Sequence, residues 1–241
     1  YMWNVNNIKG IIFDYGGTID SNGKHWAEVL WEAYRQNSVP VTKEQFREVY
    51  VYTERYLAVN PLIEPHHTFR DLLKIKIALQ IEELKSKEYL PATDNSAGYV
   101  LAISNQCYTF VRNLISEEKA LLSQLHEKYP MVLVSNFYGN VQAVLADFGI
   151  ITYFDEVIES AVVGLRKPDP AIFSLGVKQL NIPPSNIVVI GDSYTKDIVP
   201  AKSIGCKTIW LKGKGWEEDE DNATADVVIK DFEELKQVFS L

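Results

Sequence analysis

The chain has 241 residues, of which 46% are hydrophobic and 23% charged, a balance typical of a folded protein with a sizeable core. Its formal net charge of −8 argues against a nucleic-acid backbone as partner, and no apolar run approaches the ~20 residues of a membrane helix. Two cysteines, Cys107 and Cys206, form neither a metal-ligand spacing nor a disulfide framework. The first residues show no basic and apolar leader. We therefore expect a cytoplasmic protein that binds neither nucleic acid nor membrane.

The first stretch that suggests chemistry is residues 8–20, which read IKGIIFDYGGTID. The apolar run at 11–13 predicts a short buried strand that ends at Asp14. Gly16 and Gly17 follow at once, and paired glycines let a backbone turn sharply or approach a ligand closely. Ligands of open α/β sheets bind beyond the carboxyl ends of the strands, so Asp14 is a candidate nucleophile or metal ligand.

Residues 21–114 show helical spacing of apolar side chains and no convincing strand alternation. Thr42 followed by Gln45 has the pattern of a capping box, which predicts a helix start there. The predicted helices cover residues 25–36, 42–56, 68–85 and 97–114. We therefore expect this block to be an all-helical insert.

The second half of the chain alternates short apolar runs with helical patterns, which is typical of a parallel, doubly wound sheet. Ser116 is a candidate N-cap for a helix over 116–128. An acidic run at 217–221 is assigned to a solvated loop. The predicted strands cover residues 131–136, 153–158, 187–192, 207–211 and 227–229, and the helices that separate or follow them cover 141–148, 169–180, 197–204 and 232–239.

The expected fold class is therefore α/β, with a doubly wound, Rossmann-like core that is interrupted after its first strand. The near-continuous apolar strands fit a parallel sheet that is buried on both faces. The core is predicted to consist of residues 1–20 and 115–241, and the inserted helical cap of residues 21–114.

Polar side chains end three of the predicted strands: Asp14, Ser135 and Asp192. A fourth group, Lys167, lies in the loop GLRKPDP that follows another strand. Because the carboxyl ends of parallel strands meet at one edge of a sheet, these four side chains are expected to gather there. Mg²⁺ is commonly held by one or two carboxylates, waters and a substrate phosphate. Lys167 and Ser135 can bind and neutralise phosphoryl oxygens, which is most of what phosphoryl transfer requires.

Together these residues resemble the four ordered motifs of the haloacid dehalogenase-like hydrolase superfamily. The matching segments are DYGGTID at 14–20, the pair Ser135-Asn136, the pair Lys167-Pro168, and GDSYTKD at 191–197. The resemblance spans essentially the whole chain, and the helical block lies where that superfamily inserts its cap. The tract GLRKPDPAIF further resembles the phosphoglycolate phosphatase and phosphoglucomutase branch.

The resemblance implies a Mg²⁺-dependent hydrolase in which Asp14 attacks phosphorus and forms an aspartyl-phosphate. It also implies that Asp14, Asp192 and the backbone carbonyl of Gly16 are the metal ligands. Asp197 would act outside these ligands or through water, orienting the site and Lys167.

The same resemblance assigns the remaining motif residues to the phosphoryl group. Ser135 and Lys167 would join Asp14 as catalytic residues, with Ser135 donating a hydrogen bond and Lys167 neutralising charge. Asn136, Gly17 and Thr18 would complete the phosphate-binding residues. The expected substrate is a small phosphorylated metabolite, and the expected state is a monomer or homodimer.

Gly16 departs from the pattern of the family's phosphatases, which have an aspartate at this position as general acid and base. General acid–base assistance is typically worth about 10²–10⁴ in rate, and glycine has no side chain to supply it. The first half-reaction can survive with a leaving group that needs no proton, such as an acyl or aryl phosphate. Hydrolysis of the aspartyl-phosphate is expected to slow. We do not expect Asp20 to substitute, because a catalytic group must first reach the substrate.

Two alternatives to the phosphatase stay open. A phosphonate-cleaving hydrolase also has a small residue in place of the second aspartate and uses a cap lysine, for which Lys24 and Lys43 are candidates by location. A catalytically impaired phosphate-binding or regulatory protein is motivated by Gly16. The pair His66-His67 is interpreted as a polar helix end, because the sequence shows no third metal ligand beside it.

Overall fold

A six-stranded sheet lies at the centre of the computed structural model, which describes residues 4–91, 95–213 and 224–241. The strand order is β3-β2-β1-β4-β5-β6, and every neighbouring pair is parallel. The strands are β1 (Gly10–Phe13), β2 (Met131–Ser135), β3 (Glu156–Glu159), β4 (Ile187–Gly191), β5 (Lys207–Leu211) and β6 (Val227–Ile229). The predicted class, a doubly wound parallel α/β sheet, is confirmed.

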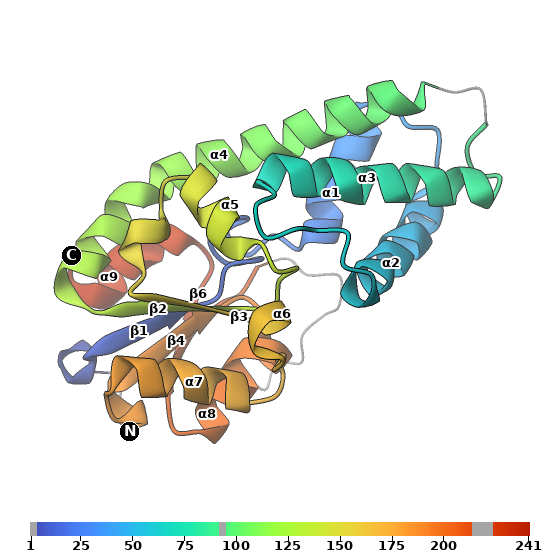
Figure 1. Ribbon diagram of the computed structural model, residues 1–241. Coiled ribbons are helices and arrows are strands. Elements are labelled where there is room, and N and C mark those ends of the chain that lie inside the picture. Colours follow the sequence, from blue (N-terminus) through green and yellow to red (C-terminus); the bar gives the residue numbers. More distant parts are fainter. Residues whose placement is uncertain (1–3, 92–94, 214–223) are drawn as a thin grey trace.

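Helices cover both faces of this sheet because successive strand side chains point to opposite sides. On β1, Ile11 and Phe13 join the apolar cluster of one face, and Ile12 belongs to the cluster of the other. Figure 1 shows α4, α5 and α9 on one side of the sheet and α7 and α8 on the other. These helices are α4 (Ser96–Lys128), α5 (Val141–Asp147), α7 (Ala171–Leu180), α8 (Val199–Ser203) and α9 (Leu235–Phe239), and the short α6 (Ser160–Val163) follows β3.

The block between β1 and β2 is helical, as predicted. It contains α1 (Trp26–Gln36), α2 (Lys43–Val59), α3 (Phe69–Ser86) and the first part of α4, and its described residues include no strand. The capping box at the start of α2 is present, since the Thr42 hydroxyl accepts from the Gln45 backbone and the Gln45 side chain accepts from the Thr42 backbone. Thr68 and Asp71 form a second capping box at the start of α3.

Helix α4 differs from the prediction, because its 33 residues run without a break where two helices were expected. Ser116 lies exposed in the middle of this helix, so its assignment as an N-cap is wrong. The helix continues because buried side chains recur at helical spacing through this point, including Ile115, Glu118 and Leu122, and no glycine or proline interrupts them. The predicted boundary between residues 114 and 115 falls inside α4. The limits of cap and core therefore remain a prediction.

Three smaller differences lie in the second half of the chain. The strand predicted from 153 begins at Glu156, since Ile151–Tyr153 forms a 3₁₀ turn. The helix predicted from 197 begins as a π-helical turn over Tyr194–Ile198. The helix predicted from 169 begins at Ala171, with Pro170 as the residue before it. The acidic run at 217–221 lies outside the described residues. None of the described helices is long and apolar enough to cross a membrane.

Glu118 is an unusual residue on the buried side of α4, where the helix passes behind the sheet. Its side chain is 3% exposed, and neither carboxylate oxygen has a hydrogen-bond partner among the described residues. Burial, reinforced by the negative charges of Asp20, Asp231, Glu233 and Glu117, raises the pKa of Glu118 to about 9.

The pKa of Glu118 predicts that stability falls as the pH rises. Its folded pKa of about 9 lies above the ordinary value of 4.5, so between these values the folded chain holds a proton that the unfolded chain releases. Glu118→Gln mimics the protonated form and removes this loss. At pH 8 we expect its melting temperature to exceed that of the wild type by about 2–4 °C or more; for a chain of this length, a shift of this size corresponds to about 1 kcal/mol. At pH 4.5 the two proteins should melt together. The exposed neighbour provides the control, since Glu117→Gln should melt close to the wild type at both pH values. If Glu118→Gln and the wild type melt at the same temperature at pH 8, the raised pKa of Glu118 is contradicted.

Candidate active site

Asp14 lies at the carboxyl edge of the sheet, between the two central strands. Its backbone N–H donates to Ile190 of β4 at 2.9 Å, and its side chain is 3% exposed. The Ser135 hydroxyl at the end of β2 donates to Asp14 Oδ1 at 3.3 Å, and the Thr18 hydroxyl donates to Asp14 Oδ2 at 3.1 Å. Each carboxylate oxygen of Asp14 therefore accepts a hydrogen bond from a hydroxyl group, which orients the carboxylate.

Lys167 supplies the positive charge beside this carboxylate. Its Nζ lies 2.6 Å from Asp14 Oδ1 and 2.6 Å from Asp197 Oδ1, with all three side chains buried. Burial alone would lower the pKa of Lys167, but the Asp14 and Asp197 carboxylates outweigh it and hold that pKa above its ordinary value. The side chain of Asn136 accepts from Lys167 N at 2.9 Å and donates to Lys167 O at 3.0 Å. The ammonium expected from the loop GLRKPDP thus belongs to Lys167, and Arg166 does not contact Asp14.

Asp192 brings a third carboxylate to the same edge, from the end of β4. Ligand oxygens of Asp14, Asp192 and Asp197 lie within 4.8 Å of one another. The Thr18 hydroxyl also reaches Asp192 Oδ1 at 3.2 Å. Burial and the nearby charges of Asp14 and Asp197 raise the pKa of Asp192 well above its ordinary value. Burial likewise raises the pKa of Asp197 to about 6 although Lys167 opposes the rise. Three carboxylates share one ammonium, and this surplus of oxygen donors and negative charge fits Mg²⁺.

The two glycines after Asp14 meet different surroundings. Gly17 has a φ of +97°, and a Cβ there would lie 2.4 Å from Asp192 Oδ2, so only glycine lets the loop pass this carboxylate. Gly16 lines the cavity, and a Cβ built on it would meet no described atom within 4 Å. The position of the missing aspartate is therefore open to the cavity rather than filled by another group.

Asp20 is fully engaged elsewhere. Its Oδ1 accepts from Gly17 N at 2.7 Å and its Oδ2 from the indole Nε1 of Trp26 at 2.8 Å. Burial raises the pKa of Asp20 to about 7. Within the described structure Asp20 is not among the residues that line the cavity. Asp20 therefore holds the loop after Asp14 against the start of α1, in keeping with the expectation that it does not substitute for the missing aspartate.

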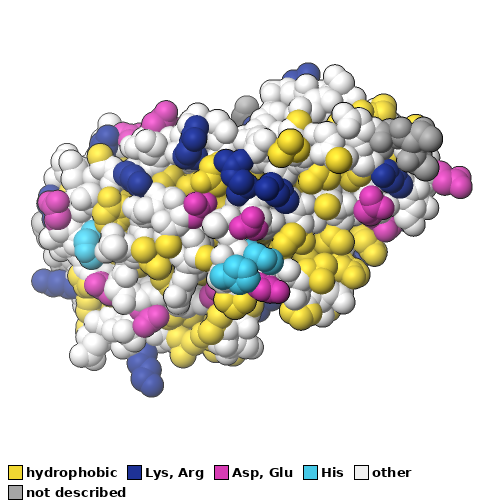
Figure 2. All heavy atoms as spheres, turned by 45° about the horizontal axis from the view of Figure 1, so that its top comes forward, with side chains coloured by type: hydrophobic (Ala, Val, Ile, Leu, Met, Phe, Trp, Pro, Cys, Tyr) yellow, Lys and Arg dark blue, Asp and Glu magenta, His cyan; other side chains and the backbone are white. Residues whose placement is uncertain are grey.

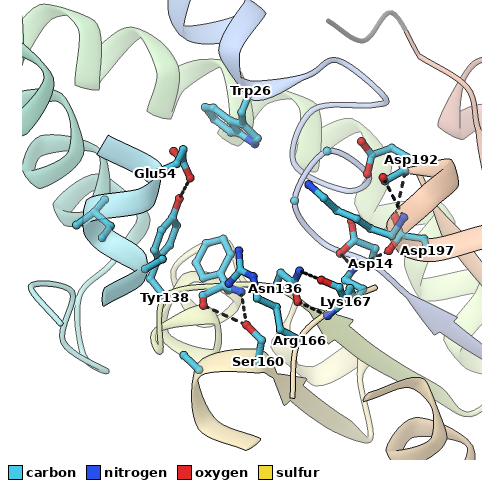
Figure 3. Close-up of a pocket in the computed structure, with 18 of the residues that line it drawn as sticks. Asp14, Trp26, Glu54, Asn136, Tyr138, Ser160, Arg166, Lys167, Asp192 and Asp197 are labelled. Carbon is cyan, nitrogen blue, oxygen red and sulfur yellow. Dashed lines mark hydrogen bonds and ion pairs between the residues drawn. The ribbon is translucent and has the colours of Figure 1, made fainter. Parts of the chain in front are cut away.

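A cavity of about 810 Å³ opens above Asp14, between the sheet edge and the helical block. We call the part around Asp14, Lys167 and Asp192 the phosphate end; the opposite part, beside Glu54 and Tyr138, is the distal end (Figure 3).

The distal end contains residues that the sequence did not single out as a site. Tyr138, from the loop after β2, donates to Glu54 Oε2 of α2 at 2.6 Å, and Lys76 of α3 forms a close ion pair with Glu54. Lys76 is 5% exposed. The available signal was its position between the apolar residues Leu73 and Ile77 on the buried side of a helix.

The alternative catalytic lysines lie away from this cavity. Among the described residues that line it, neither Lys24 nor Lys43 appears. Lys43 pairs with Glu28 at 2.8 Å, and the Lys24 ammonium lies 6.0 Å from the ring centroid of Phe110. The structure thus offers no support for a Schiff base at either lysine.

The His66-His67 pair lies on the surface beside Glu64, with ligand atoms of the three residues within 4.8 Å. Figure 2 shows histidine side chains gathered next to an acidic one on that face. A third candidate metal ligand is thus present although the sequence pattern did not reveal it. However, His67 Nδ1 accepts the Glu64 backbone N–H at 3.0 Å, which places the proton of the neutral ring on Nε2. That arrangement leaves His67 no free lone pair, so the predicted polar helix end, here just before α3, remains the better interpretation.

The two glycines provide a matched pair of substitutions. Gly17→Ala should push Asp192 aside and strain the backbone, which costs about 1–3 kcal/mol for a residue forced into a sparsely populated region. We expect weaker Mg²⁺ binding by calorimetry and a lower urea midpoint. Gly16→Ala, one residue earlier, should stay within about 0.5 kcal/mol of the wild type because its Cβ enters open space. Equal effects of both substitutions on Mg²⁺ affinity would contradict this view of the loop.

Comparison with known proteins identifies the family of this chain. The family model of the haloacid dehalogenase-like hydrolases matches residues 8–205. Glyceraldehyde 3-phosphate phosphatase of Pyrococcus furiosus is 33% identical over 152 residues, covering 59% of this chain and 60% of that protein. A 5-amino-6-(5-phospho-D-ribitylamino)uracil phosphatase of Escherichia coli is 31% identical over 133 residues, covering 55% and 54%. The chain therefore spans somewhat more than half the length of these two curated relatives.

Solved structures share the fold over nearly the whole chain. A magnesium-bound haloacid dehalogenase hydrolase of Bacillus subtilis superposes with a TM-score of 0.62 at 20% identity, covering 97% of this chain and 99% of that one. A haloacid dehalogenase phosphatase from Thermococcus onnurineus has a TM-score of 0.51 at 21% identity, covering 96% and 97%. Fold, motif positions and the family match agree: this chain belongs to the haloacid dehalogenase-like hydrolase family.

Proposed function

We propose that the protein is a Mg²⁺-dependent phosphohydrolase that acts on a small phosphorylated metabolite through an aspartyl-phosphate. The observation that carries this proposal is Asp14, held between Lys167 and the Ser135 and Thr18 hydroxyls at the floor of a cavity. The names of the curated relatives, phosphatases of glyceraldehyde 3-phosphate and of a phosphoribitylamino uracil, support a small phosphorylated substrate.

In this proposal each side chain at the phosphate end has a separate task. Asp14 is the nucleophile, and the hydrogen bonds from Ser135 and Thr18 orient its oxygens. Lys167 neutralises charge on the nucleophile and on the phosphoryl oxygens. Asp197 holds the ammonium of Lys167 at 2.6 Å and accepts Ser193 N at 3.0 Å.

Magnesium fits the same end of the cavity. Asp14, Asp192 and the Gly16 carbonyl are the proposed ligands. When bound, the ion would neutralise phosphoryl oxygens and hold them in line with Asp14. Trp210 Nε1 donates to the Asp192 carbonyl at 2.8 Å, which fixes the loop that carries this ligand. Asn136 keeps the backbone of Lys167 in register with the end of β2.

Gly16 then limits the chemistry to particular leaving groups. No described side chain fills the space beside it, and Asp20 is engaged with Gly17 and Trp26. A leaving group that departs as a stable anion, such as an acyl or aryl oxygen, needs no proton from the protein. Water that attacks the aspartyl-phosphate lacks its usual base, so the second half-reaction is expected to be the slow one.

The helical block 21–114 is proposed to act as a cap that covers the cavity and excludes water. It contributes Trp26 and Glu54 to the lining, while the core contributes Tyr138 and Arg166. The hydrogen bond from Tyr138 to Glu54 joins the two sides across the distal end.

The first test separates the two half-reactions. With Mg²⁺ and p-nitrophenyl phosphate, we expect a burst of about one nitrophenol per active site, followed by slow, matched release of nitrophenol and phosphate. Asp14→Asn should abolish the burst, because the amide cannot attack phosphorus. Matched release without a burst would show that another group activates water, and absence of both products would favour the binding-only alternative.

A second test restores the missing carboxylate. Gly16→Asp places a side chain in open space, and we expect it to raise phosphate release by about 10²–10⁴ and to remove the burst. Gly16→Asn has nearly the same shape but no acid–base function, so it is the control. An equal rise in both variants would show that shape alone limits the wild type, contrary to the proposed role of position 16.

A further inference from the structure

The lining of the cavity includes one positive charge, on Arg166, that has no role in the chemistry proposed above. At the phosphate end, Lys167 is shared by Asp14 and Asp197, and a divalent metal ion would balance the two negative charges that remain on the three carboxylates. At the distal end, the charge of Glu54 is neutralised by Lys76, and its second oxygen accepts from Tyr138. Before a substrate binds, the charges of both ends would therefore be compensated without Arg166.

Arg166 is the residue before Lys167 and lines the same cavity. Within residues 4–91, 95–213 and 224–241 its guanidinium has neither a hydrogen bond nor an ion pair to another residue. In Figure 3 it lies between the Asp14–Lys167 group and the Tyr138–Glu54 pair. Arg166 is an exposed residue, so its five N–H donors are available to a ligand in the cavity. Lys196 also lines this cavity, and within the described residues its ammonium has no ion pair either.

The backbone beneath Arg166 is rigidly placed. Asn136 holds both the N–H and the carbonyl of Lys167, and the Arg166 carbonyl accepts from Asp169 N at 3.0 Å. Consecutive Cα atoms lie 3.8 Å apart, so the Arg166 side chain leaves the backbone next to that of Lys167, whose ammonium contacts Asp14. A metabolite whose phosphoryl group lies at Asp14 would extend past this guanidinium toward the distal end.

We propose that Arg166 binds a carboxylate of the substrate, so that the preferred substrates are phosphorylated carboxylic acids. This inference rests on the proposed phosphohydrolase function and narrows its substrate class. The planar fork of an arginine matches a carboxylate in two parallel hydrogen bonds. One guanidinium balances the single negative charge of a carboxylate, whereas a second phosphoryl group has a charge near −2.

The test uses binding rather than turnover, so that slow hydrolysis does not obscure it. The ligands are 3-phosphonopropionate and propylphosphonate, which share a phosphonate on a three-carbon chain and differ in the terminal carboxylate. Calorimetry with Mg²⁺ should show that the wild type binds 3-phosphonopropionate roughly ten- to a hundredfold more tightly, the range for hydrogen bonds to charged groups. Arg166→Gln should reduce this ratio to about one and leave the affinity for propylphosphonate within a few fold. Arg166→Lys should keep part of the preference, because one of the two parallel bonds remains possible.

Lys196 provides the control for simple charge attraction. It lines the same cavity. Burial is the main cause of the lowered pKa of His25, and the positive charge of Lys196 lowers that pKa further. Lys196→Gln removes the same charge as Arg166→Gln from another place, and it should keep the wild-type ratio.

Three outcomes would overturn the inference. They are equal affinities of the wild type for the two ligands, a preference that persists in Arg166→Gln, and an equal loss in Lys196→Gln. These outcomes leave the proposed phosphohydrolase untouched as long as propylphosphonate binds with Mg²⁺. Binding of neither ligand would remove the phosphate site itself and this inference with it.

Discussion

The contact of one buried ammonium with two buried carboxylates is the interaction on which the site depends. Lys167 Nζ lies 2.6 Å from both Asp14 and Asp197, and all three groups are removed from water. Ions are costly to bury, and they persist only where partners and hydrogen bonds satisfy them. The sheet supplies that geometry, since β1 and β4 end side by side and their loops carry Asp14, Asp192 and Asp197 to one edge. Removing Lys167 would leave the carboxylates of Asp14 and Asp197 buried and uncompensated, so both depend on this one ammonium.

The loop after Asp14 joins this charged group to the helical block. Gly17 passes close to Asp192, and its N–H is held by Asp20, which also accepts from Trp26 at the start of α1. Asp20 thus connects the loop beneath the phosphate end to the start of α1. Gly16 lies within this loop and leaves open space beside the nucleophile. In this member of the haloacid dehalogenase-like hydrolase family, the candidate site surrounds a position that has no functional side chain.

Helix α4 connects the helical block to the sheet without a break. It runs from the helical block to the side of the sheet, and its buried side chains belong to the same apolar cluster as Ile11 and Phe13 of β1. The helical block is therefore packed against the sheet through a continuous apolar cluster. Tyr138 and Glu54 meet across the distal end as a consequence, although they are 84 residues apart in the sequence.

The sequence by itself determined the fold class and the edge of the sheet at which the candidate site lies. Apolar runs that end in Asp14, Ser135 and Asp192 specify buried parallel strands, and parallel strands place their carboxyl ends together whatever the details of packing. The local start of α2 was equally predictable, because a capping box involves residues only three apart.

Only the tertiary structure decided the remaining features. The continuity of α4 past Ser116 depends on burial against the sheet, which overrides a local capping signal. Asp14 contacts Lys167 rather than Arg166, and this choice depends on a pairing between distant segments. The same holds for the distal end, where Glu54 meets Lys76 and Tyr138. Residue spacing along the chain does not specify such pairings. They arise because buried charges must find partners in three dimensions.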